Sequence, residues 1–201
     1  GESLIQRIKE LLLAVRIPEP ERRVKQWPHE MSGGMRQRIV GSIAISCEPK
    51  LLICDEATTN LDVTIQLQYL NLLKDLQKNT GVTLVFITHN LGIVAELCEY
   101  VIVMYAGKIV EEAETRTLFG NPQHPYTMGL LKSIPILGDK IRRGKIRLNE
   151  IQGVVPSLYE LPSGCKFSTR CPYVIEICKE KEPELKEIEK GHFISCWLTG
   201  R

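Results

Sequence analysis

The feature that most constrains the fold of this chain is a small loop followed by a helix, a short strand and two acids. The loop is Ser32-Gly33-Gly34, and a helical pattern runs over 35–47. The four-residue apolar run 51–54 predicts a buried strand, and Asp55-Glu56 follows it directly. Free N–H groups and the positive dipole end at a helix N-terminus suit phosphate oxygens. Phosphate donors together with acids at a strand end indicate nucleotide chemistry.

The phosphate loop that usually accompanies such chemistry is missing. No G-x-x-x-x-G-K-[ST] segment occurs among the 201 residues. The chain also begins inside a helical pattern, with apolar side chains at Leu4, Ile5, Ile8, Leu11 and Leu12. We therefore expect this chain to be a piece of a longer protein.

Composition sets broad limits on the class of protein. With 43% hydrophobic residues, the chain has enough apolar material for one domain and a smaller second one. A net charge of +2 gives no reason to expect nucleic acid or an acidic membrane surface as partner. An apolar run approaching the about 18 residues of a spanning helix is absent, and so is a secretory signal. An odd number of cysteines, 7, without such a signal favours reduced thiols in the cytoplasm.

The order of predicted elements favours an α/β fold with a mostly parallel sheet, because strands and helices alternate. We expect a helix over 2–17, stopped by Pro18, and an amphipathic helix over 63–78 that ends at Gly81. The remaining expected elements are helices over 21–26, 91–99 and 127–133, a strand over 82–87, and a hairpin of strands 101–105 and 108–111. Composition and period alone leave any α/β domain open.

The order of the motifs resembles the ATP-binding subunits of ABC transporters. Met31-Ser32-Gly33-Gly34-Met35 is similar to their signature loop, and 51–55 with Glu56 to their Walker B strand. Asn60-Leu61-Asp62 resembles the D-loop, and His89 the switch histidine. Segments 28–38, 121–127 and 164–172 look like those of oligopeptide and dipeptide importers. The chain departs from the family pattern at Ala57, Asn60 and Asn90, and Asn60 leaves the D-loop contact to its partner in doubt.

This resemblance implies part of the P-loop NTPase fold of ABC ATPases, with a helical signature subdomain and a small Cys-rich, metal-binding extension. The implied domains are a helical and signature subdomain over 1–49, the Walker B to switch-histidine part of the core with a linker over 50–132, and a C-terminal domain over 133–201. The helical segment 4–26 corresponds to the part that docks the membrane subunit, although a solvated amphipathic surface explains its pattern equally well.

The resemblance also implies site residues for ATP hydrolysis. Glu56 would polarise the attacking water as general base, His89 would contact the γ-phosphate, and Asp55 would hold Mg²⁺. The nucleotide-binding set is Ser32, Gly33, Gly34, Gln37, Asp55 and Asp62. In this family the signature loop acts on ATP held by a facing subunit, so this chain alone is expected to bind ATP weakly or not at all and to be inactive.

Four cysteines crowd the end of the chain and suit a four-thiolate metal site: Cys165, Cys171, Cys178 and Cys196. Their spacing names no metal, since both the short zinc knuckles and the common ferredoxin spacing are absent. The resemblance to peptide importers implies a [4Fe–4S] cluster, with Zn²⁺ or two disulfides as alternatives. His192 lies near Cys196 and could replace a ligand, although the four cysteines suffice. The charged run 179–190 predicts a solvated face or loop.

The function that the resemblance implies is ATP hydrolysis that powers uptake of oligopeptides, dipeptides or related solutes. Its partners would be a second ATPase subunit, two transmembrane permease subunits and a solute-binding protein, at the cytoplasmic side of a prokaryotic membrane. A non-catalytic metal-cluster interaction module is the alternative from another class. A DNA-associated ABC ATPase is disfavoured by the balanced charge.

Overall fold

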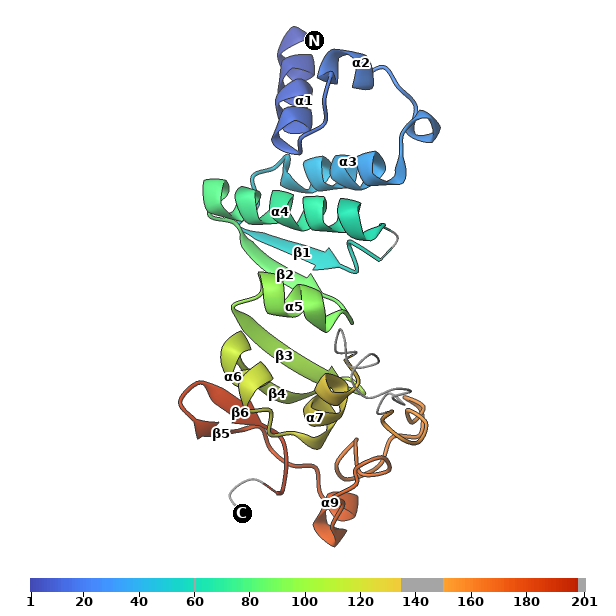
Figure 1. The fold of residues 1–201 in the computed structure, drawn as a ribbon, viewed down its shortest axis with the longest axis vertical. Helices are drawn as coiled ribbons and strands as arrows, with labels where there is room; N and C mark the ends of the chain where they lie inside the picture. Colours follow the sequence, from blue (N-terminus) through green and yellow to red (C-terminus); the bar gives the residue numbers. More distant parts are fainter. Residues whose placement is uncertain (60, 135–149, 199–201) are drawn as a thin grey trace, which may run out of the picture. The chain divides into compact units, whose positions relative to one another are not determined.

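A computed structural model describes residues 1–59, 61–134 and 150–198 (Figure 1). The chain divides into two compact units, Gly1–His89 and Asn90–Arg201. Each unit has its own cluster of buried apolar side chains. Among the described residues, no helix combines the length and the apolar character needed to cross a bilayer.

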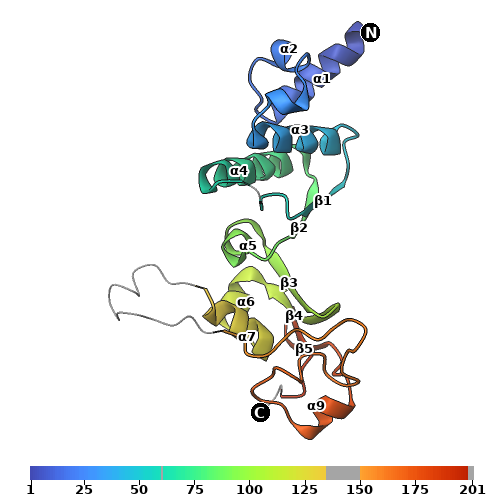
Figure 2. The same cartoon turned by 90° about the vertical axis from the view of Figure 1, so that its right-hand side faces the viewer.

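The first unit is layered, with one helix lying between another helix and a two-stranded sheet. Helix α4 (Val63–Thr80) packs between α3 (Gly33–Ile45) and the parallel strands β1 (Leu51–Asp55) and β2 (Thr83–Ile87) (Figures 1 and 2). Its remaining helices are α1 (Glu2–Ala14), α2 (Pro20–Arg23) and the 3₁₀ turn η1 (Pro28–Glu30). This arrangement puts the N-terminus of α3 and the strand ends in the same unit.

Helix α4 forms the centre of the first core. Asp62 caps its N-terminus, and Gly81, with a φ of 70°, ends it in the left-handed conformation that glycine adopts without strain. Its buried side chains lie at helical spacing: Tyr69, Leu70, Leu72, Leu73 and Leu76. The helix predicted over 63–78 is confirmed and extends two residues further.

The second unit contains a four-stranded antiparallel sheet in the order β3-β4-β6-β5. The strands are β3 (Tyr100–Tyr105), β4 (Lys108–Glu114), β5 (Lys186–Glu189) and β6 (His192–Ile194). The helices are α5 (Leu91–Leu97), α6 (Thr115–Gly120), α7 (Pro125–Lys132) and α9 (Glu176–Glu180). Ala106 and Gly107 join β3 to β4 with φ values of 46° and 78°, so the predicted hairpin is confirmed.

Three sequence predictions need correction. The expected mostly parallel sheet holds only for β1 and β2, because hairpin turns at Gly107 and Gly191 make the other described sheet antiparallel. The run 51–54 predicts a buried strand, but only Cys54 of β1 is buried, because only the face that carries Leu52 and Cys54 packs against the first core. The charged run is largely solvated as expected, and it includes the edge strand Lys186–Glu189, which pairs with β6. Helix α1 ends at Ala14 rather than Ile17, because Arg16 adopts a φ of 57° and turns the chain.

Candidate functional site

The small loop at Ser32 begins α3 and holds it close to α4. Ser32 is the N-cap residue, and its hydroxyl accepts a hydrogen bond of 3.3 Å from the N–H of Met35. A Cβ on Gly34 would lie 2.7 Å from Cγ2 of Ile65, so a side chain there would collide with α4, whereas Gly33 has open space around it. Since the first N–H groups of a helix lack intrahelical acceptors, this loop presents donors.

Glu56 and His89 meet at the carboxyl ends of the two parallel strands. Asp55 is the last residue of β1 and pairs with Ile87 of β2. The N–H of Glu56 donates to the carbonyl of Ile87 at 2.9 Å, and Glu56 has a φ of 46°, which is uncommon for a residue other than glycine. Nδ1 of His89 lies 3.2 Å from Oε1 of Glu56. The fold therefore brings the predicted base and the predicted switch histidine into contact.

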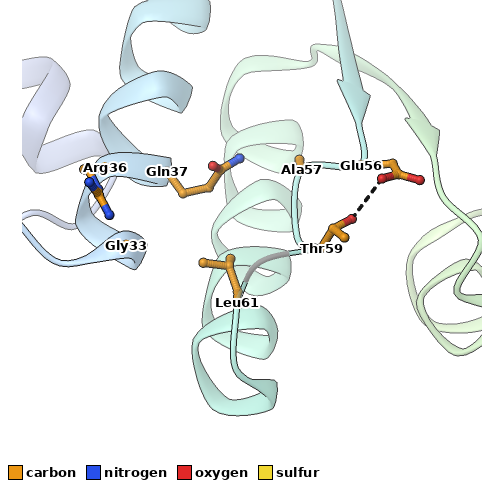
Figure 3. Close-up of a pocket in the computed structure, with 7 residues that line it drawn as sticks. All are labelled: Gly33, Arg36, Gln37, Glu56, Ala57, Thr59 and Leu61. Atoms are coloured by element: carbon orange, nitrogen blue, oxygen red, sulfur yellow. Dashed lines mark hydrogen bonds between the residues drawn. The ribbon is translucent and has the colours of Figure 1, made fainter.

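A pocket of about 250 Å³ lies between the first turns of α3 and the segment that begins at Glu56 (Figure 3). Its lining residues are Gly33, Arg36, Gln37, Glu56, Ala57, Thr59 and Leu61. Of the residues predicted for catalysis and nucleotide binding, five do not line it: Ser32, Gly34, Asp55, Asp62 and His89. Because ligand pockets usually span about 300–1,000 Å³, this pocket is not a complete nucleotide site.

Sequence reasoning assigned no role to four of these lining residues: Arg36, Ala57, Thr59 and Leu61. All four stand inside or directly beside the motifs quoted above, and that proximity was the available signal. What the sequence does not state is that the first turns of α3 and the segment after Glu56 share a cavity. The shared cavity depends on the packing of α3 against α4.

Two side chains predicted to bind nucleotide form hydrogen bonds within the first unit. Oδ1 of Asp62 accepts hydrogen bonds of 3.0 Å from two N–H groups in the first turn of α4. The side chain of Gln37 hydrogen bonds to Tyr69. The pKa of Tyr69 is raised to about 12, chiefly by burial and then by the Cys54 thiol, while the hydrogen bond from Gln37 opposes the rise. Asn60, between these segments, lies outside the described residues.

The four cysteines of the tail are free thiols in the second unit; Cys178 is buried, and Cys165, Cys171 and Cys196 are half-buried. The N–H of Cys165 donates to the carbonyl of Cys178 at 2.8 Å. Gly164 permits this approach, because a Cβ there would lie 2.4 Å from the same carbonyl oxygen. The two chain segments are therefore joined through their backbones.

These thiols influence one another electrostatically. The pKa of the Cys196 thiol is raised to about 11, chiefly by burial, with the N–H of Leu198 lowering it and the other three thiols raising it. Over residues 1–59, 61–134 and 150–198, no group of three or more His, Cys, Asp or Glu side chains is placed to hold a metal ion. The predicted metal-binding extension is therefore not shown by the structure.

His192 serves a different purpose from metal binding. Its Nε2 lies 2.8 Å from Oε1 of Glu111 on β4, and both side chains are at most 1% exposed. Glu111 also accepts the N–H groups of Gln123 at 2.7 Å and His124 at 2.9 Å. Burial lowers the pKa of His124 to about 4, with Glu111 opposing, and its Nδ1 caps α7 by accepting the N–H of Tyr126. Glu111 thus joins β6 to the loop before α7.

Family models match both units of the chain. The model described as "ABC transporter" matches residues 4–59, and the model for the C-terminal region of oligopeptide/dipeptide transporters matches residues 110–178. Together they cover every lining residue of the candidate pocket except Leu61, and three of the four tail cysteines.

Curated relatives agree with these models. The chain is 54% identical over 195 residues to a probable peptide ABC transporter ATP-binding protein of Sinorhizobium fredii, covering 97% of this chain and 57% of the relative. It is 52% identical to the dipeptide transport ATP-binding protein DppD of Haemophilus influenzae, covering 90% and 54%. It is 48% identical to the oligopeptide transport ATP-binding protein OppD of Bacillus subtilis, covering 98% and 54%. The chain thus spans little more than half the length of these relatives.

Solved structures support the fold. MJ1267, described as an ATP-binding cassette of an ABC transporter, matches with a TM-score of 0.55 at 20% identity over 64% of this chain and 50% of that one. CbiO1 of Clostridium perfringens, part of the ABC transporter complex cbiONQ, matches with a TM-score of 0.52 at 29% identity, over 60% and 47%. Both matches indicate the P-loop NTPase fold with α/β character.

The fold and the motifs define part of an ABC-type ATP-binding domain. Within that class, the chain belongs to the family of ATP-binding proteins of oligopeptide and dipeptide ABC transporters. The resemblance drawn from the sequence motifs is thereby confirmed.

Proposed function

We propose that the protein containing this chain is the ATP-hydrolysing subunit of an importer for oligopeptides, dipeptides or related solutes. The observation that carries the proposal is the Glu56–His89 contact of 3.2 Å at the strand ends, with the capped N-terminus of α3 in the same unit. Relatives at about half identity are named as ATP-binding proteins of peptide transport. Acid, histidine and helix N-terminus are the parts that phosphoryl transfer to water needs.

Each residue has a definite part in the proposed hydrolysis. Glu56 accepts the proton of the attacking water, and its contact with Nδ1 leaves Nε2 of His89 for the γ-phosphate. Asp55 offers an exposed carboxylate at the end of β1, a ligand type that suits Mg²⁺. Bound Mg²⁺ would neutralise charge on the phosphates during transfer.

The α3 N-terminus acts on the nucleotide of a facing subunit in this proposal. Ser32, Gly33 and Gly34 present N–H groups to its phosphates, while Gln37 and Asp62 hold the surrounding turns through the bonds described above. The capped turn keeps these donors in place before nucleotide arrives, which lowers the reorganisation cost of binding.

The assembly proposed for this subunit contains a second ATPase subunit, two transmembrane permease subunits and a solute-binding protein. The ATPase is peripheral, at the cytoplasmic face of the membrane. We retain the division into a helical subdomain over 1–49, a core part over 50–132 and a C-terminal domain over 133–201 as part of the proposal.

Peptide-stimulated ATP hydrolysis by the intact subunit in its assembled transporter tests this function. Hydrolysis that rises with added di- or oligopeptide, together with peptide uptake into vesicles, supports the proposal. An assembled complex that binds the tail's metal but hydrolyses no ATP would instead support the non-catalytic interaction module.

We also propose that Cys165, Cys171, Cys178 and Cys196 hold a [4Fe–4S] cluster. Their electrostatic coupling and the N–H groups directed at their sulfurs suit a cluster whose sulfur ligands accept backbone hydrogen bonds. When bound, the cluster would tie the tail segments together.

The cluster proposal predicts a brown protein with visible absorbance when the subunit is purified without oxygen. Cys171→Ser should remove most of the colour and iron, because one of four thiolates is lost. Cys47→Ser, at an exposed thiol outside the tail, should leave both unchanged. A colourless preparation that contains stoichiometric zinc would contradict the iron–sulfur assignment.

A further inference from the structure

We propose that Thr59 is a positioning residue for the Glu56 carboxylate, an inference that rests on the hydrolytic function proposed above. The hydroxyl of Thr59 donates to Oε2 of Glu56 at 3.3 Å, while Nδ1 of His89 lies 3.2 Å from Oε1 (Figure 3 shows the first bond). Each carboxylate oxygen therefore has its own partner. Two contacts on opposite oxygens restrict rotation of the carboxylate about its terminal torsion.

The turn that carries Thr59 is anchored independently of the carboxylate. Thr58 is buried, and its hydroxyl accepts a hydrogen bond of 3.0 Å from Nε2 of Gln66 on α4. Ala57 packs against the first hydrophobic core. The N–H of Thr59 donates to the carbonyl of Glu56 at 3.2 Å, which closes the turn. The two neighbouring threonines thus have separate tasks, since Thr58 holds the turn to α4 and Thr59 holds the acid.

The need for a positioning bond follows from the exposure and backbone of Glu56. Its side chain is 53% exposed, so packing alone does not restrict its rotamer. Its φ of 46° costs backbone energy that the surrounding hydrogen bonds must offset. A general base has to stand within hydrogen-bond reach of its water. The hydrogen bond from Thr59 limits the orientations of the Glu56 carboxylate and so helps to keep it within reach of the water.

Thr59→Val tests this role in the intact subunit within its assembled transporter. Valine keeps the shape of threonine and removes the hydroxyl. We expect kcat for ATP to fall about five- to tenfold, the size of a typical net hydrogen bond, with KM for ATP unchanged. Thr59→Ser, which keeps the hydroxyl, should restore kcat to within about twofold. Thr64→Val makes the same chemical change at an exposed position on α4 and is the matched control.

The comparison with Glu56→Gln separates this inference from the proposed function. In a Glu56→Gln background, Thr59→Val should lower the residual rate no further, because a residue that acts through Glu56 has no effect once the base is gone. Unchanged kcat in Thr59→Val, a loss that Thr59→Ser does not restore, or an additive loss in the double variant would each overturn the inference. Full hydrolysis by Glu56→Gln alone would instead overturn the assignment of Glu56 as base.

Discussion

Glu56→Gln is expected to lower the turnover of ATP by the intact transporter by about 10²–10⁴-fold, the range that general base catalysis contributes. The amide keeps the length of the side chain and still accepts a hydrogen bond from Thr59 or His89, so the turn after β1 should persist. It cannot accept the proton of the attacking water. Binding of ATP should therefore be unchanged, since a residue that acts only in the transition state affects kcat and not affinity.

The measurement is single-turnover hydrolysis of ATP alongside equilibrium binding of a fluorescent ATP analogue. Glu189→Gln removes a charge at an exposed carboxylate on β5, far along the chain from the strand ends, and should leave both readouts unchanged. A Glu56→Gln protein with turnover within about threefold of the unaltered protein would contradict the role of Glu56 as base. Weakened nucleotide binding would show that the acid holds the nucleotide or its metal instead.

The first unit follows from its sequence because its signals are local. The cap at Ser32, the apolar strand before Asp55 and the stop at Gly81 each depend on residues within a few positions of one another. Glu56 and His89 also follow predictably, because each stands at the carboxyl end of a strand and parallel neighbours bring those ends together.

The parts that sequence reasoning missed depend on pairing between distant segments. Strand β5 contains Lys186, Glu187 and Glu189 around one apolar residue, so its composition predicts solvation, and only the partner strand β6 makes it a strand. Thr59 had no predicted role, because the hydrogen bond from its hydroxyl to Glu56 depends on the rotamer of Glu56, which the sequence does not specify. The metal site predicted for the tail is not shown by the described residues, since the spacing of four cysteines along the chain does not specify how far apart their sulfurs lie.

Glu111 illustrates the same limit most strongly, because a charged residue in a strand predicts an exposed face. Instead, Glu111 is fully buried. Its carboxylate accepts hydrogen bonds from the backbone N–H groups of Gln123 and His124, and it lies against Nε2 of His192. Because successive side chains of a strand point to opposite faces, Glu111 is buried while its neighbour Glu112 is partly exposed.

Glu111→Ala should destabilise the second unit by about 3–5 kcal/mol, the cost of removing one partner from a buried charged network. Three groups, two of them buried and one partly buried, would lose their acceptor at once: the N–H groups of Gln123 and His124 and Nε2 of His192. Amide hydrogen exchange over 108–127 and 186–194 measures the effect, because these segments meet through Glu111 and the β4–β6 pairing. We expect protection there to fall by about 10²–10⁴-fold where opening follows unfolding of the unit.

Glu112→Ala is the matched control, because it removes the same side chain one position along β4. Its loss should cost less than about 1 kcal/mol, since a partly exposed acid keeps access to water. Glu111→Gln should fall between the two, because one amide oxygen still accepts a hydrogen bond while the amide nitrogen meets donors. If Glu111→Ala and Glu112→Ala reduced exchange protection equally, the buried acid would not be what joins β6 to the loop before α7, and the β4–β6 backbone pairing would have to account for that attachment.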